Sequence, residues 1–335
     1  MARDIDYQNA ITELRRANRV AMTCHVKPDA DALGSMAALR RWLLTLGKTV
    51  EVIVPTAPPP KCVFLDPDGV LKVAGRDVDL RKMPPPDLVC VVDTCTWLQL
   101  KGMEPLVGDS GAPVLAIDHH RTQDPLADFS LVDPEAAGAV VIVHRLLVEA
   151  GATIDAQTAT FLLAGLVADT DWFRLPNVIP DTFRLAADLV EAGASPHEIF
   201  EALHQSDELT KMLLLGRALE TLHAALDGRV MIMRLSRALF REVGADIGDT
   251  ENLINECMKV RGGKVGVLLV EADDDEIRLS LRSRPPINVM QVAQRFGGGG
   301  HHRAAGARMT GTLDRAEAEV IAALAEILDG SAEHN

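Results

Sequence analysis

The sequence predicts an α/β protein with two domains: a doubly wound, mainly parallel sheet in the first and a smaller, mixed-sheet α/β arrangement in the second. In the first part of the chain, short continuous apolar runs alternate with stretches of helical periodicity, as buried parallel strands joined by helices do. After Asp227 the order changes, and two strands follow each other directly. A chain of 335 residues fits two domains of about 100 to 200 residues each.

The first domain is expected over residues 1–190 and contains β-α-β units. Its strands are continuous apolar runs, and Gly47 ends the helix that precedes the second of them. In chain order we expect a helix over 7–18, a strand over 20–24, a helix over 32–47, strands over 49–54, 87–93 and 113–118, and helices over 136–151, 156–170 and 181–193.

A helical linker is expected over 191–226 and the second domain over 227–330. The acidic run at 273–276 fits a hairpin turn between two strands. In chain order the second domain is expected to contain a strand over 229–235, helices over 236–245 and 249–260, strands over 264–272 and 276–283, a helix over 288–297, a strand over 306–310 and a helix over 314–328.

Composition excludes several classes of protein. Apolar residues make up 47% and charged residues 24% of the chain, which is the balance of a soluble globular protein. The net charge of −14 argues against a protein that coats long duplex nucleic acid. The five cysteines form no C-x-x-C pair, which disfavours a zinc knuckle and a disulfide framework and favours a reducing cytoplasm. We find neither a signal peptide nor a membrane span.

Acidic and histidine side chains gather where the predicted strands, and one helix, end. The carboxyl ends of the strands are where open α/β sheets bind ligands. Each cluster alone is more typical of a helix cap, a turn or a surface feature, whereas together they predict a divalent metal site. Two imidazoles and four carboxylates suit paired Mn²⁺ or Mg²⁺ better than structural zinc. The six candidate ligands are His25, Asp29, Asp31, Asp93, His119 and Asp169.

A glycine-rich segment, Gly297–Gly300, is followed by His301, His302 and Arg303. Glycine backbone allows N–H groups to approach an anion, and the neighbouring side chains add positive charge. No Gly-Lys-Ser/Thr follows, so the segment is not a Walker A loop. A flexible hinge is the alternative, and phosphate or nucleotide contact is favoured. Arg282 and Arg284 could join this contact.

Five motifs in order resemble the DHH phosphoesterase superfamily over nearly the whole chain. They are HVKPDADALGS, VVDT, IDHH, ADTDWF and GGGGHHRAAG. The resemblance is to two-domain members of the nano-RNase and pAp phosphatase type, the bifunctional oligoribonucleases and PAP phosphatases. It implies that residues 1–190 form the DHH phosphoesterase domain with the metal site. Residues 227–330 would form the DHH-associated substrate-binding domain, with the active site in the cleft between the two domains.

The resemblance also implies roles for individual residues. One metal would be bound by His25, Asp29 and Asp93, and the other by Asp31, Asp93, His119 and Asp169, so that Asp93 bridges them. The implied ion is Mn²⁺, with Mg²⁺ or Co²⁺ as alternatives, and a hydroxide shared by the two ions would attack phosphorus in line. His120 would face the scissile phosphate, and Asp118 would fix the tautomer of an active-site imidazole.

The second domain would hold the far end of the substrate, through the residues Arg282, Gly299, Gly300 and His301. Arg174 is a candidate phosphate contact, and a plain surface position fits it equally well. Asp171 stands where many relatives have glycine, as a spare ligand or a base supporting the ligands. The stretch after the DHH motif, residues 121–129, also lacks the asparagine that relatives often have there. Neither difference removes a metal ligand.

The implied function is metal-dependent hydrolysis of short oligoribonucleotides to 5′-mononucleotides and of pAp (adenosine 3′,5′-bisphosphate) to AMP. Within the enzyme class the alternatives are a soluble cyclic-di-AMP or pApA phosphodiesterase and a RecJ-like single-strand exonuclease. Two alternatives come from other classes of protein. An inactive nucleotide-binding regulator would be expected to have lost a metal ligand, and a structural scaffold would not need six metal ligands. The expected partners are short oligoribonucleotides or pAp, without long duplexes or membranes, and relatives suggest a homodimer.

Overall fold

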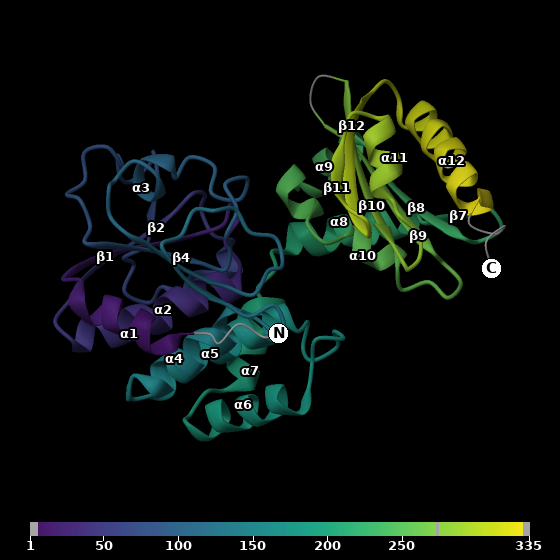
Figure 1. Ribbon diagram of the computed structural model, residues 1–335. Helices are drawn as coiled ribbons and strands as arrows, with labels where there is room; N and C mark the ends of the chain where they lie inside the picture. The colour runs from purple at the N-terminus through teal and green to yellow at the C-terminus, as the bar shows by residue number, and fades with distance from the viewer. Residues whose placement is uncertain (1–5, 273–274, 331–335) are drawn as a thin grey trace. The chain divides into compact units, whose positions relative to one another are not determined.

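The computed structural model describes residues 6–272 and 275–330, and the chain divides into two compact units, Met1–Ser206 and Asp207–Asn335 (Figure 1). Each unit contains one six-stranded sheet with helices packed against it. The segment expected as a linker, 191–226, carries one helix in the first unit and one in the second. None of the helices in the described ranges combines the length and the apolar character needed to cross a membrane.

The first unit has an all-parallel sheet in the order β3-β2-β1-β4-β5-β6. The chain leaves β1 toward one edge and later returns to its other side, so the strand order reverses between β1 and β4. The predicted doubly wound, mainly parallel sheet is confirmed. The strands are β1 (Arg19–Cys24), β2 (Thr49–Val54), β3 (Lys72–Val73), β4 (Leu88–Val92), β5 (Val114–Asp118) and β6 (Phe129–Val132).

Two sheet strands, β3 and β6, were not predicted from the sequence, because they are short and lack a continuous apolar run. The helix predicted from 136 begins instead at Ala139, since Gly138 has extended backbone and precedes the first turn. The helices of this unit are α1 (Tyr7–Arg16), α2 (Ala30–Thr45), η1 (Pro60–Leu65), α3 (Glu104–Val107), α4 (Ala139–Glu149), α5 (Ala156–Asp169), α6 (Pro180–Glu191) and α7 (Pro196–His204).

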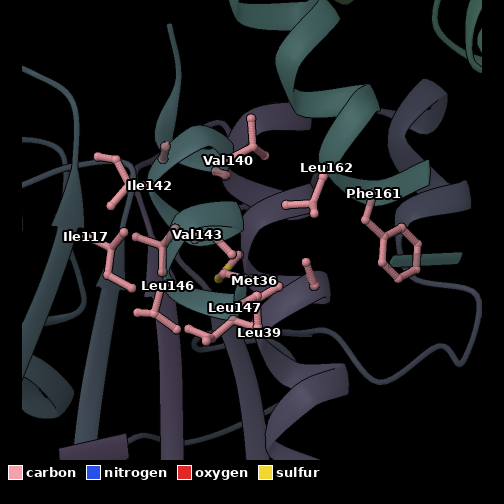
Figure 2. Close-up of a cluster of buried hydrophobic side chains, with 14 of the residues drawn as sticks. Met36, Leu39, Ile117, Val140, Ile142, Val143, Leu146, Leu147, Phe161 and Leu162 are labelled. Atoms are coloured by element: carbon pink, nitrogen blue, oxygen red, sulfur yellow. The ribbon is translucent and has the colours of Figure 1, made fainter. Parts of the chain in front are cut away.

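Both faces of the first sheet are buried, which explains its continuous apolar strands. Alternate strand residues such as Ile117 pack against α1, α2, α4 and α5, and Figure 2 shows this layer around Leu39 and Val143. The residues between them, such as Ala116, pack against α3 and the loops around it. Because both faces of the sheet are covered, polar side chains gather at the carboxyl ends of the strands.

Helices α2 and α5 approach each other closely at Gly34. A Cβ atom at this position would lie 2.3 Å from the carbonyl oxygen of Phe161, which is shorter than any van der Waals contact. Since the obstacle is backbone of the neighbouring helix, it cannot rotate away. The close approach matters for function, because Asp31 lies in the first turn of α2 and Asp169 is the last residue of α5.

The second unit has a mixed sheet in the order β11-β12-β10-β9-β8-β7, as predicted. Within the described part of this unit, β8 and β9 are parallel neighbours, and the other pairs are antiparallel. The elements are α8 (Leu209–Glu220), β7 (His223–Ala225), β8 (Val230–Leu235), α9 (Arg237–Val243), η2 (Ile247–Thr250), α10 (Ile254–Cys257), β9 (Val265–Glu271), β10 (Glu276–Ser283), α11 (Met290–Arg295), β11 (Gly299–His301), β12 (Ala304–Thr310) and α12 (Leu313–Gly330).

One expectation for this unit needs correction, and one alternative is excluded. The single helix expected over 249–260 is two short turns, η2 and α10, separated by Asn252 in a left-handed conformation. The glycine-rich segment is not a hinge, because Gly299–His301 pairs with β12 as a strand. Of the acidic run at 273–276, residues 273 and 274 lie outside the described ranges, while the strands on either side are antiparallel neighbours.

We predict that Gly34→Ala destabilises the first unit by about 1–3 kcal/mol, because the added methyl group forces α2 and α5 apart. Tryptophan fluorescence during urea unfolding would follow this, since Trp42, Trp97 and Trp172 all belong to the first unit. Gly216→Ala in α8 is the matched control: it meets no atom within 4 Å and should gain up to about 1 kcal/mol of helix propensity by circular dichroism. Equal stability of Gly34→Ala and the wild type would contradict the close-packing argument.

Candidate active site

The carboxyl ends of three adjacent strands carry the candidate residues. His25 directly follows β1, Asp93 directly follows β4, and Asp118 ends β5 and precedes His119. The order of the sheet places β1, β4 and β5 side by side, with the reversal of strand order between the first two. In open α/β sheets this is the position of the ligand site.

Asp93 lies between two imidazoles. Its Oδ2 is 3.2 Å from Nε2 of His25, and its Oδ1 is 3.4 Å from Nε2 of His119. The residue is buried and has a left-handed φ of 61°, which is costly for a side chain other than glycine. Backbone strain of this kind is typical of functional positions, where it directs a side chain that a relaxed backbone would place elsewhere.

The ring of His25 has a defined orientation. Its Nδ1 lies 2.9 Å from the carbonyl oxygen of Val26, which can only accept a hydrogen bond, so Nδ1 carries the proton. Nε2 therefore faces the carboxylates of Asp29 and Asp93, at 3.8 and 3.2 Å. Asp29 also caps α2, since its Oδ1 accepts the N–H groups of Asp31 and Ala32 at 3.0 and 3.1 Å.

Asp118 organises the turn that carries both histidines. Its Oδ1 accepts the backbone N–H groups of His119 and His120 at 2.8 and 3.1 Å, and it lies 2.7 Å from Nδ1 of His120. The hydrogen bond to Asp118 raises the pKa of His120, and its side chain is half exposed. The fixed ring leaves Nε2 of His120 as its remaining polar atom.

Asp31 is fully buried and links two helices. Its carboxylate accepts the N–H groups of Ala139 and Val140, at 2.6 and 2.9 Å, at the beginning of α4. These donors and the positive end of the helix dipole favour a carboxylate at this place. On the other side of the cluster, Oδ2 of Asp169 at the end of α5 lies 3.3 Å from Nε2 of His119.

Two glycines that sequence reasoning missed make room for Asp31. A Cβ atom at Gly138 would lie 2.9 Å from Oδ2 of Asp31, and one at Gly165 would lie 3.0 Å from its Cα and 2.5 Å from the side chain of Val140. Both glycines stand within or next to apolar helical stretches, where glycine is unfavourable without a packing reason. A glycine in an apolar helical stretch was therefore the sequence signal that could have identified these two positions.

The charges of the cluster favour cations. Burial alone would lower the pKa of His25, but its contacts with Asp29 and Asp93 raise it to about 11. Burial also lowers the pKa of His119, but Asp93 and Asp169 outweigh this effect and raise the pKa to about 10. Burial raises the pKa of Asp169 to about 6 and that of Asp31 well above its usual range, with the neighbouring carboxylates adding to the effect. For Asp93, burial is outweighed by the two imidazoles, which lower its pKa.

These side chains fit divalent metal ions. Among the described residues, three groups each bring one ligand atom per residue to within 4.8 Å of the others. Oδ1 of Asp93 is buried and accepts no hydrogen bond within the described ranges, which leaves its lone pairs available to a metal ion. Two neighbouring ligands about 2.1 Å from an octahedral ion lie about 3 Å apart, close to the separations around Asp93. The groups are His25 with Asp29 and Asp93; Asp31 with His119 and Asp169; and Asp93 with His119 and His120.

The residues expected to bind substrate differ in their partners. In the described ranges, the Arg282 guanidinium donates only to the carbonyl oxygen of Leu281, and burial lowers its pKa. Arg284 instead donates to the carbonyl oxygens of Gly263 and Met258, so its guanidinium holds a loop. Arg174 is exposed and pairs with the carboxylate of Asp171.

Asp171 lies outside the three candidate ligand groups. The exposed residues Gly299, Gly300 and His301 belong to β11. A Cβ atom at Gly300 would lie 2.5 Å from the carbonyl oxygen of Ala304, so glycine is required there by the tight hairpin with β12.

Two segments of the chain match known domain families. Residues 19–166 match the DHH family, N-terminal domain, and residues 227–330 match the DHHA1 domain. The bifunctional oligoribonuclease and PAP phosphatase NrnA of Thermus thermophilus is 30% identical over 310 residues, covering 92% of this chain and 90% of that protein. The chain belongs to the DHH family.

A second relative agrees with this assignment and confirms the resemblance noted in the sequence, and two solved structures share the fold. NrnA of Bacillus subtilis is 27% identical over 84% of this chain and 87% of that protein. Among solved structures, an exopolyphosphatase-related protein from Bacteroides fragilis has a TM-score of 0.89 at 22% identity, over 97% of this chain and 98% of its own. RecJ of Thermus thermophilus in complex with Mn²⁺ has a TM-score of 0.55 at 16% identity, over 96% and 55% of the two chains.

We predict that metal binding releases protons and strengthens as pH rises. His25 and His119, with pKa values of about 11 and 10, are protonated at neutral pH and must lose a proton from Nε2 to bind a metal. Each displaced proton should raise the observed affinity about ten-fold per pH unit between pH 6 and pH 8. Calorimetric titration of the metal-free protein with Mn²⁺, in buffers of different ionisation enthalpy, measures both effects.

The control for this titration is His144→Asn. Burial lowers the pKa of His144, which lies outside the three candidate ligand groups, so this variant should release as many protons as the wild type. Affinity that does not change with pH, together with no proton release, would exclude the two imidazoles as ligands.

Proposed function

We propose that this protein is a metal-dependent phosphoesterase that hydrolyses short oligoribonucleotides to 5′-mononucleotides and dephosphorylates pAp to AMP. The observation that carries the proposal is the meeting of His25, Asp93 and His119 at the reversal point of a parallel sheet. Membership of the DHH family and the NrnA relatives, which are named for these two activities, support it. The buried free cysteines fit a reducing cytoplasm, where we place the protein.

We assign the six ligands to two Mn²⁺ ions. His25 and Asp29 would hold one ion, and Asp31, His119 and Asp169 the other, with Asp93 shared because its two oxygens face opposite imidazoles. When bound, such ions acidify water to give a nucleophile and neutralise charge on the phosphoryl oxygens. Histidine and carboxylate ligands of this kind suit Mn²⁺ or Mg²⁺.

The remaining residues of the turn would orient the substrate. Asp118 holds the ring of His120 through Nδ1, and the raised pKa of this imidazole favours its cationic form. A cationic ring with one nitrogen fixed donates its other N–H to an anionic phosphoryl oxygen. His120 would therefore hold the scissile phosphate in line with the nucleophile.

The second unit would hold the end of the substrate that is not hydrolysed. Arg282 is a half-buried guanidinium with donors to spare, which is the state of an anion-binding group before its ligand arrives. His301 lies exposed on the neighbouring hairpin. By contrast, Arg284 and Arg174 already have partners and are weaker candidates for phosphate contact.

Product analysis tests the proposed function. Purified protein with Mn²⁺ is offered pAp, a 5′-labelled dinucleotide, a pentanucleotide, a long single-stranded RNA and cyclic-di-AMP in parallel. Fast loss of pAp and the dinucleotide with slow loss of the long strand is expected. Preference for the cyclic dinucleotide or for the long strand would overturn the proposal in favour of a signalling phosphodiesterase or a RecJ-like exonuclease.

We predict that Asp93→Ala and His119→Ala each lower kcat on the order of 10³-fold or more, because each removes a ligand needed to stabilise charge in the transition state. Circular dichroism should show retained folding, and the affinity for Mn²⁺ should fall with activity. An Asp93→Ala variant with near wild-type turnover would exclude the shared-carboxylate arrangement.

A substitution of Arg282 in the second unit should affect KM rather than kcat. Arg282→Ala should raise KM by about 10- to 100-fold with little change in kcat, since it removes a charge-assisted contact to a part of the substrate remote from the reaction. Arg284→Ala is the matched control, and it should alter thermal stability rather than KM because its guanidinium donates to backbone carbonyls. Equal effects of the two substitutions on KM would contradict this division of roles.

A further inference from the structure

The turn after β4 lies between the two other turns that carry histidine ligands. It follows Asp93, whose carboxylate lies between the imidazoles of His25 and His119. These two histidines follow the neighbouring strands β1 and β5, so their distances to Asp93 depend on how the three turns are held together. The segment 94–100 continues from Asp93, and the ligand groups found in the described ranges include none of its residues. Its contacts therefore bear on the geometry of the cluster without supplying a ligand.

This segment makes a direct hydrogen bond to the turn on each side. On the β1 side, the backbone N–H of Val26 donates to the carbonyl oxygen of Gln99 at 2.8 Å. On the β5 side, the backbone N–H of Asp124 donates to the carbonyl oxygen of Cys95 at 2.7 Å. Oδ2 of Asp124 also accepts the backbone N–H of Trp97 at 2.8 Å. Since the bond on the β1 side joins two main chains, Asp124 supplies the side chain that ties these turns together.

Asp124 is also the point at which the chain after His120 is fixed again. Residues 121–123 are exposed, and in the described part of the chain their backbone makes no hydrogen bond. Beyond Asp124, Leu126 donates its N–H to the carbonyl oxygen of Asp124 at 2.8 Å and is buried in the same apolar cluster as Cys95. The tie therefore rests on packed residues, while the stretch between it and His120 is held only at its ends.

We infer that Asp124 is a positioning residue of the metal site. Without its side-chain acceptor, the turn of His119 would be less firmly held against the segment that follows Asp93. The left-handed backbone of Asp93, with a φ of 61°, persists only where its surroundings hold the chain on both sides. Small displacements of ligands lower both metal affinity and turnover. This inference rests on the proposed function, in which Asp93 and His119 bind a catalytic ion.

A role through charge is the alternative to a role through position. Asp124→Asn keeps an acceptor oxygen in place and removes the negative charge. Asp124→Glu keeps the charge and moves the acceptor by one methylene group. If position matters, the Asn variant should resemble the wild type and the Glu variant should be impaired. A role through charge predicts the reverse.

The test measures metal binding and turnover separately on the full chain. In Asp124→Ala, the Kd for Mn²⁺ from calorimetric titration of the metal-free protein should rise about ten-fold, and kcat for pAp should fall about ten-fold. KM for pAp should change by less than about two-fold, since the residue acts through the metal ligands. Asp124→Asn should return Kd and kcat to within about two-fold of the wild type, whereas Asp124→Glu should not.

Asp128→Ala is the matched control. Asp128 makes the same kind of tie, since its backbone N–H donates to the carbonyl oxygen of Val114 at 2.9 Å and its Oδ2 accepts the N–H of Val114 at 2.8 Å. Val114 begins β5, four residues before Asp118 at its end, which corresponds to about 13 Å of strand. This variant should lose thermal stability as Asp124→Ala does, but keep the wild-type Kd and kcat.

Two results would overturn the positioning role of Asp124. One is wild-type Kd and kcat in both Asp124→Ala and Asp124→Glu, and the other is an equal loss of both quantities in Asp128→Ala. If Asp124→Ala does not fold, an impaired Asn variant beside an intact Glu variant still excludes positioning. The proposed function fails separately, when the wild-type protein binds Mn²⁺ but hydrolyses neither pAp nor oligoribonucleotides.

Discussion

The buried carboxylate of Asp93 is the constraint on which the rest of this structure depends. A carboxylate without water is costly unless positive charge and hydrogen-bond donors surround it, and here two imidazoles face its two oxygens. Both imidazoles come from neighbouring strands, so the parallel order of β1, β4 and β5 is what makes this arrangement reachable. The left-handed backbone at Asp93 is tolerated because the flanking strand and its neighbours determine the direction of the chain on both sides.

The helical layer is adapted to the same cluster. Asp31 can lie fully buried only because α4 begins at its carboxylate and offers two N–H groups. That beginning requires Gly138, and the approach of α5 requires Gly165. The close contact of α2 with α5 therefore serves two purposes, since it closes the apolar core and brings Asp31 and Asp169 together near His119. Stability of the core and geometry of the site are coupled in this unit.

Much of this could be predicted from the sequence, and the failures have physical reasons. Strand β2 was predicted at its observed bounds, because continuous apolar runs mark buried strands and charged or proline-rich segments end them. The short edge strands of both sheets were missed, since they have too few residues to form a pattern; they are β3, β6, β7 and β11. The sequence alone could not show that Arg284 donates to backbone carbonyls while Arg282 does not, because residue type gives the donors of a side chain but not its partners. The alignment of Arg282, Ala304 and His301 in one cross-strand row likewise required the register.

Net charge is a poor guide to what the second unit can bind. At an ionic strength of about 0.1 M, charges more than about 10 Å away are largely screened, so the distant part of the acidic surplus has little effect on a ligand beside Arg282. Such a ligand meets the local row of Arg282, Ala304 and His301. The acidic total still disfavours binding along a long duplex, which would have to lie over many distant carboxylates. An acidic protein in which Arg282 is the local cation thus suits short single strands, because only a few phosphates can lie within range of one guanidinium group.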